Sequence, residues 1–266
     1  MRAAGDAEAD AAADRILFHV LGLDRAQFYR ERDRPLTPAA QAMLTRLLER
    51  RLRGEPVAYL TGRAPFRTLT LEVTPAVLVP RPETELLVEQ ALTLLRAAAA
   101  PRVVDVGTGC GAIALALAAE CPQAEVLATE RSWAALAVAR RNRDRLGLPV
   151  TLIAADLLGP LRGPFDLVIA NLPYLDPETY ARLPKEVRQW EPPGALLGGP
   201  GGLAVIERLL AQVGDRLARP GAVVLEIAYD QGARACQLAR QYFPTATVSL
   251  LRDYAGHERV VQILVP

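Results

Sequence analysis

The spacing of hydrophobic residues along the chain changes near residue 102. Before that point apolar residues recur at intervals of three and four, as in Ile16, Leu17, Val20 and Leu21, which predicts amphipathic helices. After it, short apolar runs alternate with longer segments of helical spacing. Such alternation is typical of a parallel sheet with helices on both faces. We therefore expect an α/β fold that follows a smaller helical unit.

The helical unit is expected to extend from about residue 11 to residue 53, after a frayed tail over residues 1–10. Thr37 followed by Pro38 favours a helix start, because threonine caps a helix and proline suits its first turn. Residues 66–79 alternate in polarity around Thr74-Pro75, which predicts a β-hairpin. A helix over 83–99 follows.

These patterns predict three parts of the chain. Residues 1–65 form a helical N-terminal domain, residues 66–80 a hairpin linker, and residues 81–266 an α/β domain. The strands expected in the α/β domain cover 103–106, 125–129, 151–154, 165–170, 222–227, 247–251 and 260–265. The helices between them cover 112–120, 133–146, 203–217 and 231–242. No helix separates the last two strands, so the last strand is expected to run antiparallel in a doubly wound, mostly parallel sheet.

Composition narrows the class of protein. The chain has 266 residues, 51% of them hydrophobic and 23% charged, with a net charge of +1, so bulk charge indicates neither nucleic acid nor an anionic membrane as a partner. Three scattered cysteines and two histidines favour neither a disulfide framework nor a zinc site. The N-terminus is not a secretory signal, and no apolar run is long enough to span a membrane. A cytoplasmic enzyme without a bound metal is expected.

A glycine-rich loop follows the strand at 103–106. Gly107, Gly109 and Gly111 give the spacing G-x-G-x-G, which is neither the dinucleotide fingerprint nor a P-loop. The loop resembles the first motif of Rossmann-like methyltransferases, whose backbone cups the amino-acid part of S-adenosylmethionine. The residues expected to bind this donor are Gly107, Thr108, Gly109, Cys110 and Gly111. A tight strand-to-helix turn without a ligand is the alternative for this loop.

Two acidic residues are expected at the same edge of the sheet, where ligands bind in this fold. Glu130 lies just past the second strand, where a carboxylate can accept hydrogen bonds from both ribose hydroxyls. Asp156 ends the third strand and is expected to contact the adenine amino group, with Leu157 packed on the ring. A solvated helix cap is the alternative role for Glu130.

The fourth strand leads directly into Asn171-Leu172-Pro173-Tyr174. The side-chain oxygen of Asn171 and the carbonyl of Leu172 can accept the two N–H groups of a planar nitrogen. Pro173 restricts the preceding residue, and Tyr174 offers a ring face for stacking. Asn171 and Tyr174 are therefore the expected catalytic residues, and Asn171 also borders the donor. An Asn-x-Pro turn that merely ends a strand is the alternative.

Further stretches make the resemblance more specific. Glu55–Gly62, Val79–Glu85, Glu191–Leu203 and the segments around Glu226 and Asp253 look like motifs of the bacterial peptide chain release factor N5-glutamine methyltransferases. Residues 80–85 look like the family's "PRPETE" segment beside the active site, which implies substrate-binding roles for Arg81, Pro82, Glu83 and Glu85 with Asn171, Leu172, Pro173 and Tyr174.

The resemblance implies methyl transfer from S-adenosylmethionine to the side-chain amide nitrogen of the glutamine in a Gly-Gly-Gln motif. It gives release factors as the protein partner and S-adenosylhomocysteine as a product, with no direct contact to nucleic acid or membrane, and we expect a monomer. The family usually has proline where this chain has Leu172, aspartate where it has Glu130, and Trp-Gly where it has Phe66-Arg67.

Three rival functions stay open at this point. One is glutamine methylation on a ribosomal protein, since the same motifs occur there. A second is adenine-N6 methylation of RNA or DNA, because Asn-Leu-Pro-Tyr also resembles the loop of ribosomal RNA adenine dimethyltransferases. The third is a donor-binding adaptor without activity, against which Asn171 and Tyr174 argue.

Overall fold

The computed structural model describes residues 9–266. Of the tail expected over residues 1–10, residues 1–8 lie outside the described part, and Ala9 already begins the first helix. The first four helices are α1 (Ala9–Leu21), α2 (Arg25–Glu31), α3 (Pro38–Leu52) and α4 (Val57–Thr61). The side chain of Thr37 caps α3 by accepting from the backbone N–H of Ala40 (3.2 Å), as the Thr-Pro pair predicts.

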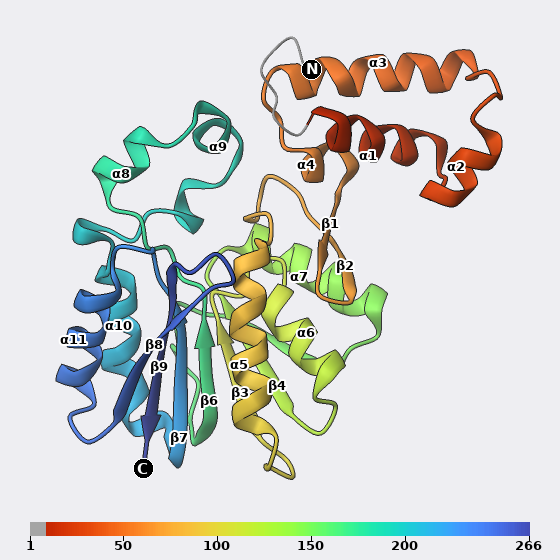
Figure 1. The fold of residues 1–266 in the computed structure, drawn as a ribbon. Helices are drawn as coiled ribbons and strands as arrows, with labels where there is room; N and C mark the ends of the chain where they lie inside the picture. The colour runs from red at the N-terminus through yellow and green to blue at the C-terminus, as the bar shows by residue number, and fades with distance from the viewer. Residues whose placement is uncertain (1–8) are drawn as a thin grey trace.

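Three of these helices, α1, α3 and α4, share a small core of their own. Ile16, Leu47 and Leu60 are buried there, and Val20 and Leu44 pack against them. Figure 1 shows the helices at one end of the molecule, joined to the rest through a two-stranded hairpin.

That hairpin consists of β1 (Arg63–Phe66) and β2 (Leu69–Glu72), which pair antiparallel. Its turn is at Arg67, whose φ of 51° is in the left-handed region, and not at Thr74-Pro75 as the sequence pattern predicts. The predicted turn is wrong because Arg67 is held from outside the hairpin. Its backbone N–H donates to Glu85 (2.8 Å), and its guanidinium donates to both oxygens of Glu120 (2.5 and 2.7 Å).

The free edge of β2 is held by a buried asparagine. Asn142 accepts from the backbone N–H of Glu72 (2.6 Å) and donates to the carbonyl of the same residue (2.9 Å). It also donates to the carbonyl of Cys110 (3.0 Å) in the glycine-rich loop. The hairpin and that loop are therefore tied to one side chain.

The remaining strands form one sheet in the order β5-β4-β3-β6-β7-β9-β8. Their bounds are β3 (Arg102–Val106), β4 (Glu125–Glu130), β5 (Val150–Ala154), β6 (Phe165–Ala170), β7 (Leu217–Glu226), β8 (Thr247–Arg252) and β9 (Glu258–Val265). The pairs among β5, β4, β3, β6 and β7 are parallel, whereas β9 is antiparallel to both β7 and β8. The predicted doubly wound sheet with an antiparallel last strand is confirmed.

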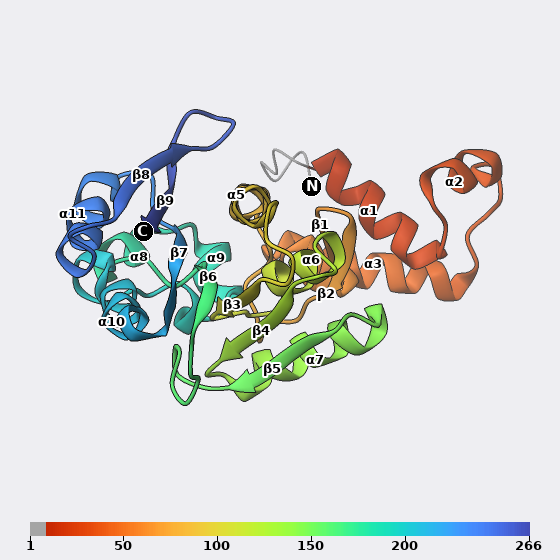
Figure 2. The same cartoon turned by 90° about the horizontal axis from the view of Figure 1, so that it is seen from below.

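Helices cover both faces of this sheet, as Figure 2 shows. The helices are α5 (Glu85–Leu95), α6 (Ala112–Glu120), α7 (Trp133–Leu146), α10 (Ala204–Val213) and α11 (Gly232–Tyr242). Successive strand residues point to opposite faces, so Val103 joins a core with α5 and α6 while Val104 joins a second core with α10 and α11. Both faces are buried, which explains the nearly continuous apolar strands.

The helices at 112–120 and 133–146 and the strand at 165–170 have the predicted bounds. The helix predicted over 83–99 is shorter, since a 3₁₀ turn at Pro82–Thr84 precedes α5. Two short helices, α8 (Pro177–Arg182) and α9 (Lys185–Trp190), were not expected. Within residues 9–266, no helix combines the length and apolar character needed to cross a bilayer.

Candidate functional site

The glycine-rich loop turns sharply between β3 and α6. Gly107 has a φ of 77°, and a Cβ atom there would lie 2.9 Å from the side chain of Leu172. Glycine is required at this position by both the backbone conformation and the close approach. The N–H groups of Gly107 and Thr108 donate to the carbonyl of Thr129 (2.9 Å each), which fixes the loop on β4.

Asp105 anchors the loop from below. Its Oδ2 accepts from the hydroxyl of Thr108 (2.6 Å) and the N–H of Ala114 (3.2 Å). The side chain is buried, and its Oδ1 has no hydrogen-bond partner among the described residues. Burial raises the pKa of Asp105 to about 7, and the two hydrogen bonds oppose that shift. Sequence reasoning did not select Asp105, which is the buried polar residue of β3.

Glu130 is the last residue of β4 and faces the loop. Its Oε2 accepts from the N–H of Gly109 (3.0 Å), and its Oε1 accepts from the N–H of Ser132 (2.8 Å). Each carboxylate oxygen can accept more than one hydrogen bond, so both retain capacity for a ligand's hydroxyl groups. Two backbone donors thus orient a carboxylate at the edge of the cavity.

Asp156 and Leu157 lie two and three residues beyond the end of β5. Asp156 is exposed and forms an ion pair with Arg208, while Leu157 is buried with a φ of 54°. Both line the same cavity as the glycine-rich loop. That cavity therefore receives residues that follow β3, β4, β5 and β6.

Asn171 begins the loop after β6 and lines this cavity. Its Nδ2 donates to the hydroxyl of Thr84 (3.0 Å), and that hydroxyl donates to Oε2 of Glu226 (2.7 Å). The hydroxyl of Tyr174 donates to Oε1 of Glu226 (3.3 Å). Glu226 is buried at the end of β7, and burial raises its pKa to about 7. One carboxyl group thus connects both residues expected to be catalytic.

Tyr174 does not line the cavity with the other residues of its loop. Its carbonyl accepts from Nε2 of Gln231 (2.7 Å), and burial raises the pKa of its hydroxyl. Gly198 and Gly202 allow the next loop to lie against it, since a Cβ at either position would meet the main chain of Pro173 or Tyr174 at 2.5 Å or less.

The segment after the hairpin forms another wall. Arg81 lines the cavity, and its Nη2 donates to both carboxylate oxygens of Glu191 (2.5 and 2.7 Å), whose side chain is buried. Pro82, Glu83 and Glu85 do not line the cavity. Glu85 instead accepts from the backbone of Arg67 in the hairpin.

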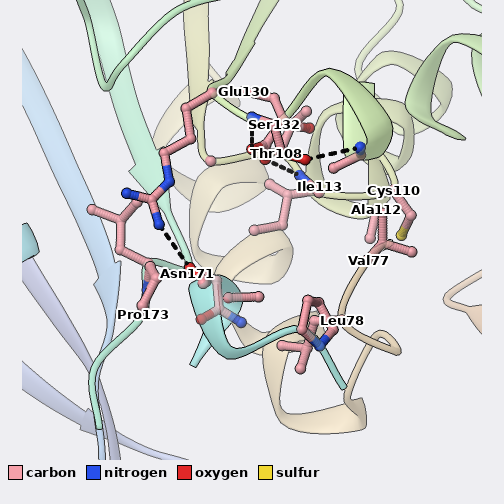
Figure 3. Close-up of a pocket in the computed structure, with 18 of the residues that line it drawn as sticks. Val77, Leu78, Thr108, Cys110, Ala112, Ile113, Glu130, Ser132, Asn171 and Pro173 are labelled. Carbon is pink, nitrogen blue, oxygen red and sulfur yellow. Dashed lines mark hydrogen bonds between the residues drawn. The ribbon is translucent and has the colours of Figure 1, made fainter. Parts of the chain in front are cut away.

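The structure brings most predicted site residues to one cavity, seen in Figure 3. The figure shows Glu130 and Ser132 at the top, Leu78 at the lower right, and Asn171 and Pro173 at the left. Those that line the cavity are Arg81, Gly107, Thr108, Gly109, Cys110, Glu130, Asp156, Leu157, Asn171, Leu172 and Pro173. Those that do not are Pro82, Glu83, Glu85, Gly111 and Tyr174.

Sequence reasoning missed several lining residues. Val77, Leu78 and Pro80 come from the extended segment after the hairpin, and Ile113 comes from the first turn of α6. Their apolar character carried no signal, because such residues are equally common in a core. The described residues contain no cluster of histidine, cysteine, aspartate or glutamate suited to a metal ion.

Two family models match the chain. The model described as the PrmC N-terminal domain matches residues 1–62, and the one described as the methyltransferase small domain matches residues 82–183. A curated relative from Bordetella pertussis, named release factor glutamine methyltransferase, is 45% identical over 91% of this chain and 90% of its own length. A relative of the same name from Moorella thermoacetica is 42% identical over 93% of this chain and 88% of its own length.

Solved methyltransferase structures share the fold. A methyltransferase from Pyrococcus furiosus matches with a TM-score of 0.53 and 20% identity, over 83% of this chain and 98% of its own. A T. thermophilus 16S rRNA N2 G1207 methyltransferase, in complex with AdoMet and guanosine, matches with a TM-score of 0.54 and 18% identity, over 77% of this chain and 50% of its own.

Proposed function

The chain belongs to the release factor glutamine methyltransferase family, and from that premise we propose which residues of the cavity perform the reaction. The protein methylates a release factor glutamine on its side-chain amide nitrogen, in an S-adenosylmethionine-dependent reaction. The observation that carries the assignment of residues is the convergence of Gly107–Cys110, Glu130 and Asn171 on one cavity.

The residues of the cavity suit S-adenosylmethionine, which supplies an electrophilic methyl group on its sulfonium. Glu130, oriented by two backbone donors, binds the ribose hydroxyls. The glycine-rich loop brings backbone close to the amino-acid part, and Asp105 holds that loop through the hydroxyl of Thr108. Leu157 packs on the adenine ring, and Asp156 exchanges its contact with Arg208 for the adenine amino group.

The glutamine side chain enters between Asn171 and the donor. An amide nitrogen is a weak nucleophile because its lone pair is delocalised, so its orientation decides the rate. The side-chain oxygen of Asn171 and the carbonyl of Leu172 accept its two N–H groups, which also favours the positive charge that develops on nitrogen. Arg81, fixed by Glu191, lines the same cavity. Tyr174 acts from outside the cavity, by holding the loop.

The N-terminal helices are proposed to recognise the release factor. We propose residues 1–65 as the recognition domain, 66–80 as the linker and 81–266 as the catalytic domain. Exposed apolar side chains on α2 and α3 and between them, Tyr29, Leu36 and Met43, support a protein-binding role. We propose that the protein acts in the cytoplasm, because its substrate takes part in translation, and that it is a monomer.

The test is incubation of the purified protein with isotope-labelled S-adenosylmethionine and an unmethylated release factor. Mass spectrometry of the Gly-Gly-Gln peptide is expected to show one methyl group on the glutamine. A release factor with alanine in place of that glutamine is the matched control and should gain no label. Label on a ribosomal protein or on adenine, with none on the release factor, would contradict the proposal.

A further inference from the structure

Three buried or half-buried side chains form a hydrogen-bonded relay that leads away from the cavity, which Asn171 and Thr84 line and Glu226 does not. Thr84 and Glu226 are buried, at 4% and 2% exposure, and neither belongs to the loop after β6. The relay runs from Nδ2 of Asn171 to Thr84 (3.0 Å) and from Thr84 to Glu226 (2.7 Å). Its members come from three parts of the fold, the loop after β6, the 3₁₀ turn before α5 and the end of β7.

The number of hydrogens in this relay fixes its direction. An ionised carboxylate only accepts, so Thr84 must use its single hydroxyl hydrogen on Glu226. The hydroxyl oxygen of Thr84 can then only accept from Asn171, and only the amide NH₂ of Asn171 can donate. The opposite end of that carboxamide, Oδ1, is left to accept a hydrogen bond from a ligand.

We propose that Glu226 and Thr84 are positioning residues that hold the carboxamide of Asn171 with its oxygen toward the substrate amide. This inference rests on the proposed function, in which Asn171 accepts an N–H of the glutamine. A reversed carboxamide would direct an NH₂ group at the substrate NH₂, which gives donor against donor. The relay therefore selects the one of two isosteric orientations that supports transfer.

The relay depends on the charge of Glu226. A protonated Glu226 can donate to Thr84, whose hydrogen then turns to Asn171 and favours the reversed carboxamide. Burial raises the pKa of Glu226 to about 7, while Thr84, Tyr174 and the guanidinium of Arg259 on β9 oppose the shift and Glu83 adds to it. Arg259 is itself paired with Asp253 (3.2 Å).

The first test compares Thr84→Val with Thr84→Ser in single-turnover methylation of a release factor. Valine has the shape of threonine without the hydroxyl, and serine keeps the hydroxyl. We expect Thr84→Val to lower the rate about tenfold, as the loss of one orienting hydrogen bond implies, and Thr84→Ser to restore most of it. The dissociation constant of S-adenosylmethionine should stay within about twofold in both, because neither variant alters Glu130 or the glycine-rich loop.

Thr93→Val is the matched control, since the hydroxyl of Thr93 is exposed and donates only to the carbonyl of Glu89 in its own helix. Its rate should equal that of the wild type. Equal rates for Thr84→Val and Thr84→Ser, with an active wild type, would overturn the inference. An inactive wild type would contradict the proposed function instead, so the two failures are distinguishable.

The second test is the pH profile, which a merely structural role would not change. The wild-type single-turnover rate is expected to rise through about pH 7 as Glu226 ionises. Glu226→Gln can donate to Thr84 at every pH, so that variant should be slower at about pH 8.5 and should lack this rise. If the single-turnover rate of Glu226→Gln still rises with pH, with the same midpoint as the wild type, the titration belongs to another group. That result would contradict the role of Glu226.

Discussion

Leu172 shows how a single side chain can serve the cavity from behind. It is 4% exposed, and its Cδ2 lies where a Cβ on Gly107 would be only 2.9 Å away. The leucine therefore fills the space over the glycine-rich loop, while its backbone carbonyl remains available to the substrate. This explains how leucine can replace the proline that is usual in the family.

We expect Leu172→Ala to lower the free energy of unfolding by about 2–5 kcal/mol, because it leaves a cavity over Gly107. The effect on transfer should be much smaller than that of removing Asn171, since the carbonyl persists. Urea unfolding measures the first effect, and single-turnover methylation the second. Leu52→Ala, at a site 55% exposed, is the control and should change stability little.

Asn171→Ala removes the acceptor that holds the glutamine amide. We expect a loss of transfer of about 100-fold to 1000-fold, typical of one preorganised hydrogen-bonding group in an active site. Donor binding, measured by calorimetry, should persist because Glu130 and the glycine-rich loop are unchanged. Retained turnover would show that the loop after β6 is only structural.

At the scale of residues, the sequence predicts those that belong to a recognisable motif. It does not predict those that act through another residue of the chain. Asn171, Glu130 and the glycines could be selected because strand ends converge at one edge of a parallel sheet. Thr84, inside the stretch from Arg81 to Glu85, was passed over for its charged neighbours. The relay to Glu226 joins residues 142 positions apart, which no local pattern reveals.

At the scale of elements, the hairpin departs most from expectation. Apolar residues alternate over 63–66 and again over 69–73, and the alternation shifts phase at Arg67-Thr68, where the chain folds back. Contacts to α5 and α6 through Arg67 decide the turn, and they are distant in sequence. The short helices α8 and α9 have only six residues each, too few for a helical period to stand out.

Arg67→Ala is predicted to loosen the hairpin from the catalytic domain. The guanidinium contacts Glu120 and Glu89, and its side chain is 17% exposed, so its removal breaks both ion pairs, and only Glu89 keeps another partner among the described residues, the hydroxyl of Tyr254. We expect a loss of about 1.5–3 kcal/mol in the free energy of unfolding. The KM for the release factor should rise while the dissociation constant of S-adenosylmethionine stays unchanged.

Arg143→Ala provides the comparison, because Arg143 forms an ion pair with its helix neighbour Asp144, which is 58% exposed. Such surface pairs contribute little to stability. A rise in KM of the same size in both variants would show that the hairpin does not set the position of the N-terminal helices.

Two buried carboxyl groups give the whole molecule a pH dependence. Burial raises the pKa of Asp105 and of Glu226 to about 7 in the folded protein, above their values in the unfolded chain. The folded state therefore binds protons more tightly, and the stability from this effect is present at low pH and lost as pH rises through about 7. Urea unfolding between about pH 5 and pH 8 should show a falling free energy of unfolding.

Asp105→Asn and Glu226→Gln should each remove part of that slope, because neither amide titrates. A slope that is unchanged in the double variant would assign it to other groups. Bound S-adenosylmethionine adds stability by mass action at every pH, so the comparison is made without it.

At the scale of the whole molecule, the architecture is the feature that the sequence predicts best. Apolar strands that alternate with helices specify a doubly wound sheet. What the pattern could not give is the position of β9, which enters between β7 and β8 although it follows both in sequence. Antiparallel pairing of β9 with β7 on one edge and with β8 on the other defines that position, and it is a property of the assembled sheet.

The relay from Asn171 to Glu226 also links methyl transfer to the correct pairing of β7 in the sheet. Its acceptor is at the end of β7, a strand that pairs on one side with β6 and on the other with β9. Glu226 itself pairs with Val260 of β9, so methyl transfer is expected to depend on the insertion of β9 into the sheet.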